Sequence, residues 1–179
     1  MKIYTIRILY LVLYQFIASQ GMFYLIGISK AMKSISISAF IEQRKAIDAV
    51  IGNPLRFLYF SSMGCAIILL AVNIRSPRSI TFITIGLSLL CIAADLYLAL
   101  GKSIPLNQII NNYPSNKYLN IGQVRDQWLT YINCRGAIAI IGLFILLSGF
   151  LVEAYGKNNG SSVTRSVKKS SQASGIEVP

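Results

Sequence analysis

The chain contains no histidine among its 179 residues. This absence excludes histidine metal ligands, histidine-ligated haem, and the Ser-His-Asp and Cys-His forms of nucleophilic catalysis. Acidic residues are also scarce, with 6 Asp and Glu against 17 Lys and Arg, so the formal net charge is +11. Only 13% of the residues are charged and 54% are hydrophobic, whereas roughly 25% of an ordinary soluble domain is charged. Such a chain forms one domain, or at most two small ones, and most of it is ordered.

The positive charge does not indicate a nucleic-acid-binding protein, because the basic residues do not cluster within a soluble framework. The three cysteines, Cys65, Cys91 and Cys134, are widely spaced and form no CxxC pair or metal-ligand pattern. All three lie in or beside apolar segments, where cysteine usually serves as a small buried hydrophobic residue. We therefore expect no nucleic-acid partner, no metal and no cofactor.

Four apolar segments are long enough to cross a bilayer, which takes about 20 helical residues. They cover residues 8–28, 57–74, 80–100 and 131–152. Their only charged residues are Asp95 and Arg135. A soluble helical domain would need polar helix faces, which these segments lack. Because backbone groups in hydrocarbon must bond internally, the sequence predicts an all-α integral membrane protein, with an antiparallel four-helix bundle over residues 1–155.

The first segment follows Lys2 and Arg7, as in a signal peptide, but it is longer than a signal-peptide core. We expect it to be an uncleaved anchor. Residues 75–79 form a short turn, so the second and third segments make an antiparallel hairpin. Two longer connections, residues 29–56 and 101–130, then lie together on the other side of the membrane from both termini. Each is expected to be an extramembrane loop that contains short helices.

The first connection predicts an amphipathic helix at residues 38–51, which Gly52-Asn53-Pro54 should end. On this helix Arg44 shares a face with three apolar residues, Phe40, Ile47 and Ile51. In the second connection, Asn120 can cap a helix that meets no breaker from Ile121 to Tyr155 and is about 52 Å long. Residues 156–179 are rich in Gly, Ser, Asn and Lys, which predicts a disordered basic tail.

Lys and Arg residues near the ends of the spans indicate the orientation, because cytoplasmic loops carry an excess of them. The terminal side carries Lys2, Arg7, Arg75, Arg78, Lys157, Arg165, Lys168 and Lys169. The long-loop side carries Lys30, Lys33, Arg44, Lys45, Arg56, Lys102, Lys117 and Arg125. The totals are equal, but the short turn and the tail are denser in basic residues. We predict that both termini are cytoplasmic, in a bacterial inner membrane.

Polar residues within the spans are costly in hydrocarbon and therefore informative. One stripe on the third helix contains Ser88, Cys91, Asp95 and Lys102. One stripe on the fourth helix contains Arg125, Trp128, Ile132 and Arg135. Asp95 lies about 7 Å from the end of its span and Arg135 about 6 Å from the start of its own, so antiparallel packing places them at one depth. We predict that Asp95 pairs with Arg135 or with Lys102, because a neutral pair makes burial tolerable.

The functional interpretation of this pair is a polar pocket at the outer mouth of the bundle. Its candidate residues are Asp95, Asn107, Arg125, Trp128, Tyr131 and Arg135, with Gln20 of the first helix as a further member. The alternative is a salt bridge that only fixes the register of two helices. Since the chain lacks histidine, any proton transfer in the bundle would fall to Asp95, a tyrosine or an amine.

The residues after the third span also resemble a known pattern. They are Pro105-Leu106-Asn107, followed about twenty residues later by Arg125, Trp128 and Arg135. The pattern is similar to that of the anthrone-oxygenase-like family of small four-helix membrane proteins, which tend to have Pro-x-Asn after the third span and a Trp and an Arg entering the fourth. The resemblance covers residues 8–152 and matches Asn107, Trp128 and Arg135. It implies a four-helix bundle and, from a few relatives, cofactor-independent oxygenation of anthrones to anthraquinones.

Three functions are compatible with these features. The first is a small multi-pass protein whose pocket binds or transforms a small organic molecule. The second is an accessory or structural subunit of a larger membrane complex, or a homo-oligomer. The third is a transporter, which is disfavoured because the sequence shows neither inverted repeats nor broken spans.

Overall fold

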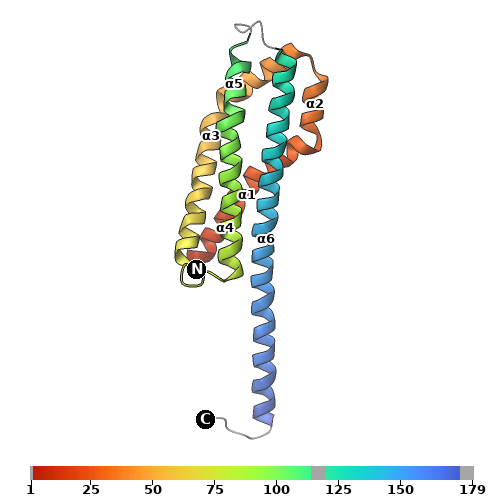
Figure 1. Ribbon diagram of the computed structural model, residues 1–179. Coiled ribbons are helices and arrows are strands. Elements are labelled where there is room, and N and C mark those ends of the chain that lie inside the picture. Colours follow the sequence, from red (N-terminus) through yellow and green to blue (C-terminus); the bar gives the residue numbers. More distant parts are fainter. Residues whose placement is uncertain (1, 114–119, 174–179) are drawn as a thin grey trace.

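The computed structural model describes residues 2–113 and 120–173, with side chains described over residues 3–113 and 120–155 (Figure 1). The elements are α1 (Lys2–Phe23), π-helix η1 (Tyr24–Ile28), α2 (Ser29–Ser34), α3 (Ile37–Val72), α4 (Ile80–Leu98), π-helix η2 (Ala99–Ser103), α5 (Ile104–Asn111) and α6 (Ile121–Ala173). The described residues contain no strand. This architecture confirms the predicted all-α fold.

Four helical segments are long and apolar enough to cross a membrane, at residues 3–34, 37–72, 80–111 and 121–155. Each has 32 to 36 residues, which is about 48–54 Å of helix against about 30 Å of hydrocarbon. The spans therefore continue past the membrane as helix. Much of what we predicted to be loop, residues 29–56 and 101–130, belongs to these extensions. Figure 1 shows α2 and α5 at the end of the bundle opposite both termini.

The prediction that Gly52-Asn53-Pro54 ends a helix is wrong, because α3 continues through Pro54 to Val72. Proline removes one backbone hydrogen bond and pushes against the carbonyl of the preceding turn, which normally disrupts a soluble helix. Long membrane helices tolerate it, because neighbouring groups can satisfy the freed carbonyl. Here all three residues are exposed, so the proline ring meets no packed neighbour.

Helix α6 begins at the predicted residue, Ile121, and is capped by Asn120, whose Oδ1 accepts from the backbone N–H of Gly122 at 3.2 Å. It does not stop at Tyr155. Residues 156–173, which we predicted to be disordered, continue the helix and project beyond the bundle (Figure 1). No proline interrupts the sequence after residue 120 until Pro179, so backbone hydrogen bonding can continue. The rest of the predicted tail, residues 174–179, lies outside the described residues.

Helices α1 and α6 cross where two glycines meet. A Cβ atom placed on Gly136 would lie 2.8 Å from the Cα of Gly21, closer than real Cβ contacts. The backbones can therefore approach only because both residues lack a side chain.

Replacing Gly136 with alanine should therefore destabilise the bundle, because the added methyl group meets backbone that cannot move aside. The expected loss is roughly 1–3 kcal/mol in the free energy of unfolding, as for other overpacked sites. Reversible unfolding in mixed detergent micelles measures it. Gly64→Ala is the matched control, because a Cβ there has nothing within 4 Å. Equal stability of the two variants would contradict the proposed close contact.

Candidate functional site

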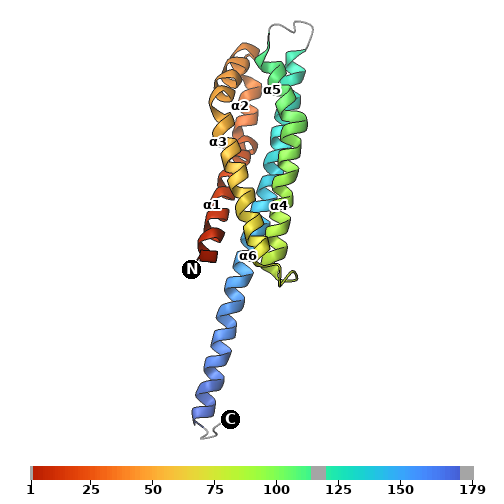
Figure 2. The same ribbon diagram turned by 90° about the vertical axis from the view of Figure 1, so that its left-hand side faces the viewer.

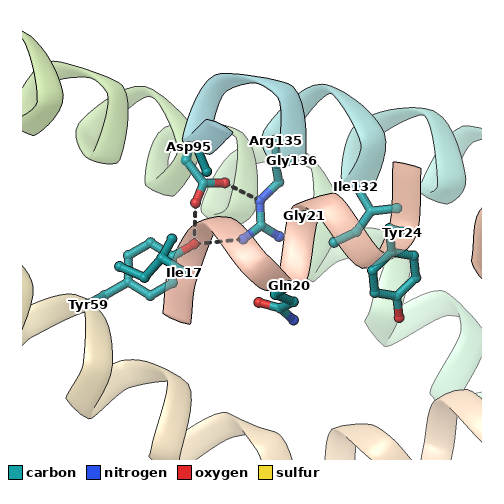
Figure 3. Close-up of a pocket in the computed structure, with 10 residues that line it drawn as sticks. Ile17, Gln20, Gly21, Tyr24, Tyr59, Asp95, Ile132, Arg135 and Gly136 are labelled. Atoms are coloured by element: carbon teal, nitrogen blue, oxygen red, sulfur yellow. Dashed lines mark hydrogen bonds and ion pairs between the residues drawn. The ribbon is translucent and has the colours of Figure 1, made fainter. Parts of the chain in front are cut away.

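Asp95 is the centre of the polar layer inside the bundle and is only 2% exposed. Its Oδ1 accepts a hydrogen bond of 2.6 Å from Nε of Arg135, so the predicted pair with Arg135 is present. Its Oδ2 accepts from the hydroxyl of Tyr59 on α3. Arg135 Nη2 also donates to the Tyr59 oxygen at 3.4 Å. Figure 3 shows the carboxylate, the phenol and the guanidinium closing a triangle between three helices.

A seven-residue spacing on α4 explains how Asp95 comes to face the interior. Thr81, Ser88 and Asp95 are all buried, as expected for residues two helical turns apart. The next residue at this spacing would be Lys102, but Lys102 is exposed and Ser103 is buried instead. The cause is η2, because a π-helix turn adds one residue to the repeat. The alternative pairing of Asp95 with Lys102 is therefore wrong.

The triangle satisfies two buried charges within one small volume. Arg135 is also largely buried, with 11% of its side chain exposed. Removing one partner of such a pair leaves an uncompensated charge in a medium of low dielectric constant, at a cost of about 3–5 kcal/mol. The third partner, Tyr59, is one of ten tyrosines, and no feature of the sequence distinguishes it from the others.

The space beside this triangle is very small. It is lined by Gln20, Tyr24, Tyr59, Asp95 and Arg135 among other residues, and its volume is about 10 Å³. A single water molecule needs about 10–15 Å³. Figure 3 shows the side chain of Gln20 between Tyr59 and Tyr24 on the open side of the triangle. The Asp95 site therefore has room for about one water molecule and for no organic ligand.

A second polar cluster surrounds Trp128 towards the outer end of the bundle. The Arg44 guanidinium carbon lies 4.3 Å from the centre of the indole ring, a cation–π contact. Tyr24 and Phe40 meet the ring edge-on at centroid distances of 5.8 and 6.0 Å. The indole Nε1 donates to Asn107 Oδ1 at 2.6 Å. Trp128 is thereby fixed from four directions, by contacts from η1, α3 and α5.

An ion pair on α3 extends this cluster. Arg44 Nη2 donates to Asp48 Oδ1 one turn along the helix, and to Asn107 Oδ1 at 3.4 Å. The other oxygen of Asp48 accepts from Asn111 Nδ2 at 3.1 Å. Arg44 Nε is buried and has no hydrogen-bond partner among the described residues. The network ties α3 to α5 and leaves one donor of Arg44 unused.

Between the two clusters lies a cavity of about 70 Å³, which we call the outer cavity. Its polar lining residues are Gln20, Tyr24, Arg44, Asp48, Ser103, Asn107, Trp128 and Arg135. Ile47, Ile51, Leu55 and Ile132 supply the apolar part of its wall. A cavity of about 150 Å³ holds benzene in another protein. The outer cavity therefore holds a few water molecules, or one end of a small molecule.

The structure brings together four of the six predicted site residues. The outer cavity is lined by three of them, Asn107, Trp128 and Arg135. The fourth, Asp95, accepts a hydrogen bond from Arg135. Arg125 lies elsewhere, because its Nη1 donates to the carbonyl of Ile35 at 3.2 Å, where α2 ends and a free carbonyl needs a donor. Tyr131 is half-buried and lines neither cavity.

Sequence reasoning missed Tyr24, Tyr59, Asp48 and Ser103 as site residues. It also did not assign Arg44 to the site. The sequence could have indicated Arg44, because a single charge on the apolar face of an amphipathic helix needs a buried partner. It could not have indicated Ser103, whose burial depends on the residue that η2 inserts. Its hydroxyl is buried and has no hydrogen-bond partner among the described residues.

No protein-family model, curated protein or solved structure matches this chain. The resemblance to the anthrone-oxygenase-like family therefore stays a prediction. What the chain can do must be argued from its own residues.

Replacing Asp95 with asparagine should strongly destabilise the bundle, because the shape is kept while the charge of Arg135 loses its partner. We expect a loss of about 3 kcal/mol in the free energy of unfolding, and partial recovery when Arg135→Gln is added. Asp126→Asn is the control, since Asp126 is exposed and its ion-pair distances are 3.9 Å. That change should cost less than about 1 kcal/mol. Unfolding in detergent measures wild type, both single variants, the double variant and the control, and strictly additive effects at positions 95 and 135 would show that the pair is not coupled.

Proposed function

We propose that this protein is a small multi-pass membrane protein that binds a small organic molecule in the outer cavity. One observation carries the proposal: two buried polar groups on the wall of this cavity, Arg44 Nε and the Ser103 hydroxyl, have no hydrogen-bond partner among the described residues. A buried donor without a partner is costly and therefore rare in native structures. Two such donors on one cavity point to a ligand that supplies the missing acceptors.

Two acceptor groups of the cavity, the carboxylate of Asp48 and the amide oxygen of Asn107, already have partners. Both oxygens of Asp48 accept hydrogen bonds, and Asn107 Oδ1 accepts from Trp128 and from Arg44. The buried groups that remain are Arg44 Nε and the Ser103 hydroxyl. A ligand with a carbonyl, ester or ether oxygen can accept from both.

The charge balance favours a neutral ligand. Arg44 is paired with Asp48, and Arg135 is paired with Asp95. An added anion would therefore meet no uncompensated positive charge, and its desolvation would be costly. The aromatic and aliphatic lining residues suit an apolar body attached to the acceptor oxygen.

The resemblance to the anthrone-oxygenase-like family would give such a ligand a ketone oxygen. The cavity is nevertheless about half the size of one that holds benzene. A three-ring anthrone enters only if the helices separate at this level. The geometry therefore supports binding, and catalysis is not part of the proposal.

A second candidate function, an accessory subunit of a larger membrane complex, is favoured by the projecting part of α6. Residues 156–173 extend away from the bundle as a single helix (Figure 1). An isolated helix of this length is only marginally stable in water, and packing against another surface is what usually stabilises one. A partner protein would provide such a surface.

To test for a ligand, the full chain is purified from its membrane in mild detergent and extracted with solvent for mass spectrometry. Ile51→Phe should reduce the co-purified molecule about tenfold, because the larger ring fills the cavity to which Ile51 contributes. Val50→Phe is the matched control. Val50 precedes Ile51 in the sequence, but it is 72% exposed and faces away from the bundle. Circular dichroism confirms that both variants fold.

Identical extracts from wild type and Ile51→Phe would contradict ligand binding in this cavity. A stoichiometric protein partner that co-purifies equally with all three chains, without a bound molecule, would support the accessory-subunit function instead.

We further infer that the protein lies in a bacterial inner membrane with both termini in the cytoplasm. The turn that joins α3 to α4 has two exposed arginines, Arg75 and Arg78, at the same end of the bundle as both termini (Figure 2). This local density of positive charge supports the orientation, although the two sides carry equal totals.

A reporter fused to the C-terminus tests this orientation. A fluorescent protein that matures only in the cytoplasm should be bright there, and alkaline phosphatase at the same position should be inactive. Fusions at Asn112, directly after α5 and at the end of the bundle opposite both termini, should give the reverse pattern. Active phosphatase at the C-terminus would show that the orientation is inverted.

A further inference from the structure

A larger cavity lies at the other end of the bundle, between the first turns of α1 and the part of α6 that leaves the bundle. Its volume is about 250 Å³, and Tyr4, Arg7, Ile8, Leu11, Phe150 and Glu153 contribute to its wall. Figure 2 shows the N-terminal end of α1 alongside α6 at this level. The outer cavity is lined by none of these residues, so the two sites are separate.

The polar end of this cavity is held by an ion pair. Arg7 Nη1 donates to Glu153 Oε2 at 2.7 Å, and the Thr81 hydroxyl donates to the same oxygen at 2.7 Å. Arg7 is only 9% exposed, yet its Nε is buried without a hydrogen-bond partner among the described residues. A buried guanidinium N–H without an acceptor costs free energy, so a ligand oxygen that accepts from it would be stabilising.

The position of the pair along the membrane normal identifies the surroundings. Arg7 immediately precedes the apolar segment 8–28, and Glu153 immediately follows the apolar segment 131–152. Both residues therefore lie at the boundary between hydrocarbon and headgroups. Leu11 lies one turn deeper than Arg7, about 6 Å into the hydrocarbon. The cavity thus has a polar end at headgroup level and an apolar end within the membrane.

We propose that this cavity is a binding site for one anionic phospholipid. A phosphate oxygen accepts from Arg7 Nε, and part of an acyl chain lies against Ile8, Leu11 and Phe150. The volume exceeds the roughly 150 Å³ that holds benzene, so several methylene groups fit. Because Glu153 compensates the charge of Arg7, the attraction for an anionic headgroup comes from Arg75 and Arg78, which are exposed at the same end of the bundle and form no ion pair within the described residues.

Native mass spectrometry of the delipidated full chain tests the proposal. The probes are palmitoyl-oleoyl phosphatidylglycerol and palmitoyl-oleoyl glycerol, which has the same chains but no phosphate. Leu11→Trp should lower phosphatidylglycerol binding about tenfold, because the indole fills the apolar end. Leu9→Trp is the matched control, since Leu9 is on the same helix but is 48% exposed and does not line the cavity.

Arg7→Lys tests the headgroup contact by itself. Lysine keeps the charge opposite Glu153 but has no Nε–H at the guanidinium position. The preference for phosphatidylglycerol over the phosphate-free lipid should fall about tenfold, as for one charged hydrogen bond, while binding of the phosphate-free lipid is unchanged. The thermal unfolding midpoint of each variant in detergent shows whether it is folded.

Three results would overturn the proposal. Equal lipid binding by folded Leu11→Trp and wild type would mean that lipid only surrounds the protein non-specifically. An unchanged headgroup preference in Arg7→Lys would remove the assigned donor. A dimer that Leu11→Trp dissociates, in protein free of lipid, would mean that a second copy of the chain fills the cavity.

Discussion

The buried pair of Asp95 and Arg135 constrains how the other helices pack. Neither charge can face hydrocarbon without a large cost in free energy, so α4 and α6 must meet with these two residues at one depth. That register aligns two further contacts between the third and fourth spans. Thr81 reaches Glu153 at one end, and Asn107 reaches Trp128 at the other. A shift of α4 by one turn along α6 would break all three contacts together.

The remaining helices fit around this register. α1 crosses α6 at Gly21 and Gly136, and Gly142 leaves space for the Tyr14 hydroxyl, where even a methyl group would collide. Two π-helices, η1 and η2, then each add one residue beyond the polar layer. The insertion turns Ser103 inward on one helix and Ser29 inward on the other. Single-turn π-helices often occur at functional sites, and here they border the outer cavity.

Much of the fold follows from rules that the sequence obeys locally. Hydrophobic length fixed the four spans, and matching the depths of Asp95 and Arg135 gave their pair, because both arguments need only the helical rise. The misplaced features depend on neighbours. The sequence pattern places Lys102 on the stripe of Asp95, because a π-helix insertion leaves no mark on residue type. The rules of soluble helices predict that Pro54 ends a helix, and Tyr59 joins the site only because α3 passes beside Asp95.

The distribution of polar groups bears on whether a molecule could pass through the bundle. Two turns along α4 from Asp95, towards the end with the termini, the Tyr10 hydroxyl forms a hydrogen bond with the Ser88 hydroxyl. The Tyr14 hydroxyl donates to the backbone carbonyl of Ser88, so both tyrosine hydroxyls are used within the protein. Ile17, Ile92 and Leu143 belong to the same apolar core cluster as the two tyrosines and are nearly completely buried. In the described part of the chain, the outer cavity is thus separated from the opposite face by a packed apolar layer. The proposed ligand of the outer cavity would therefore enter and leave on that side only, because the packed layer closes the way through the bundle.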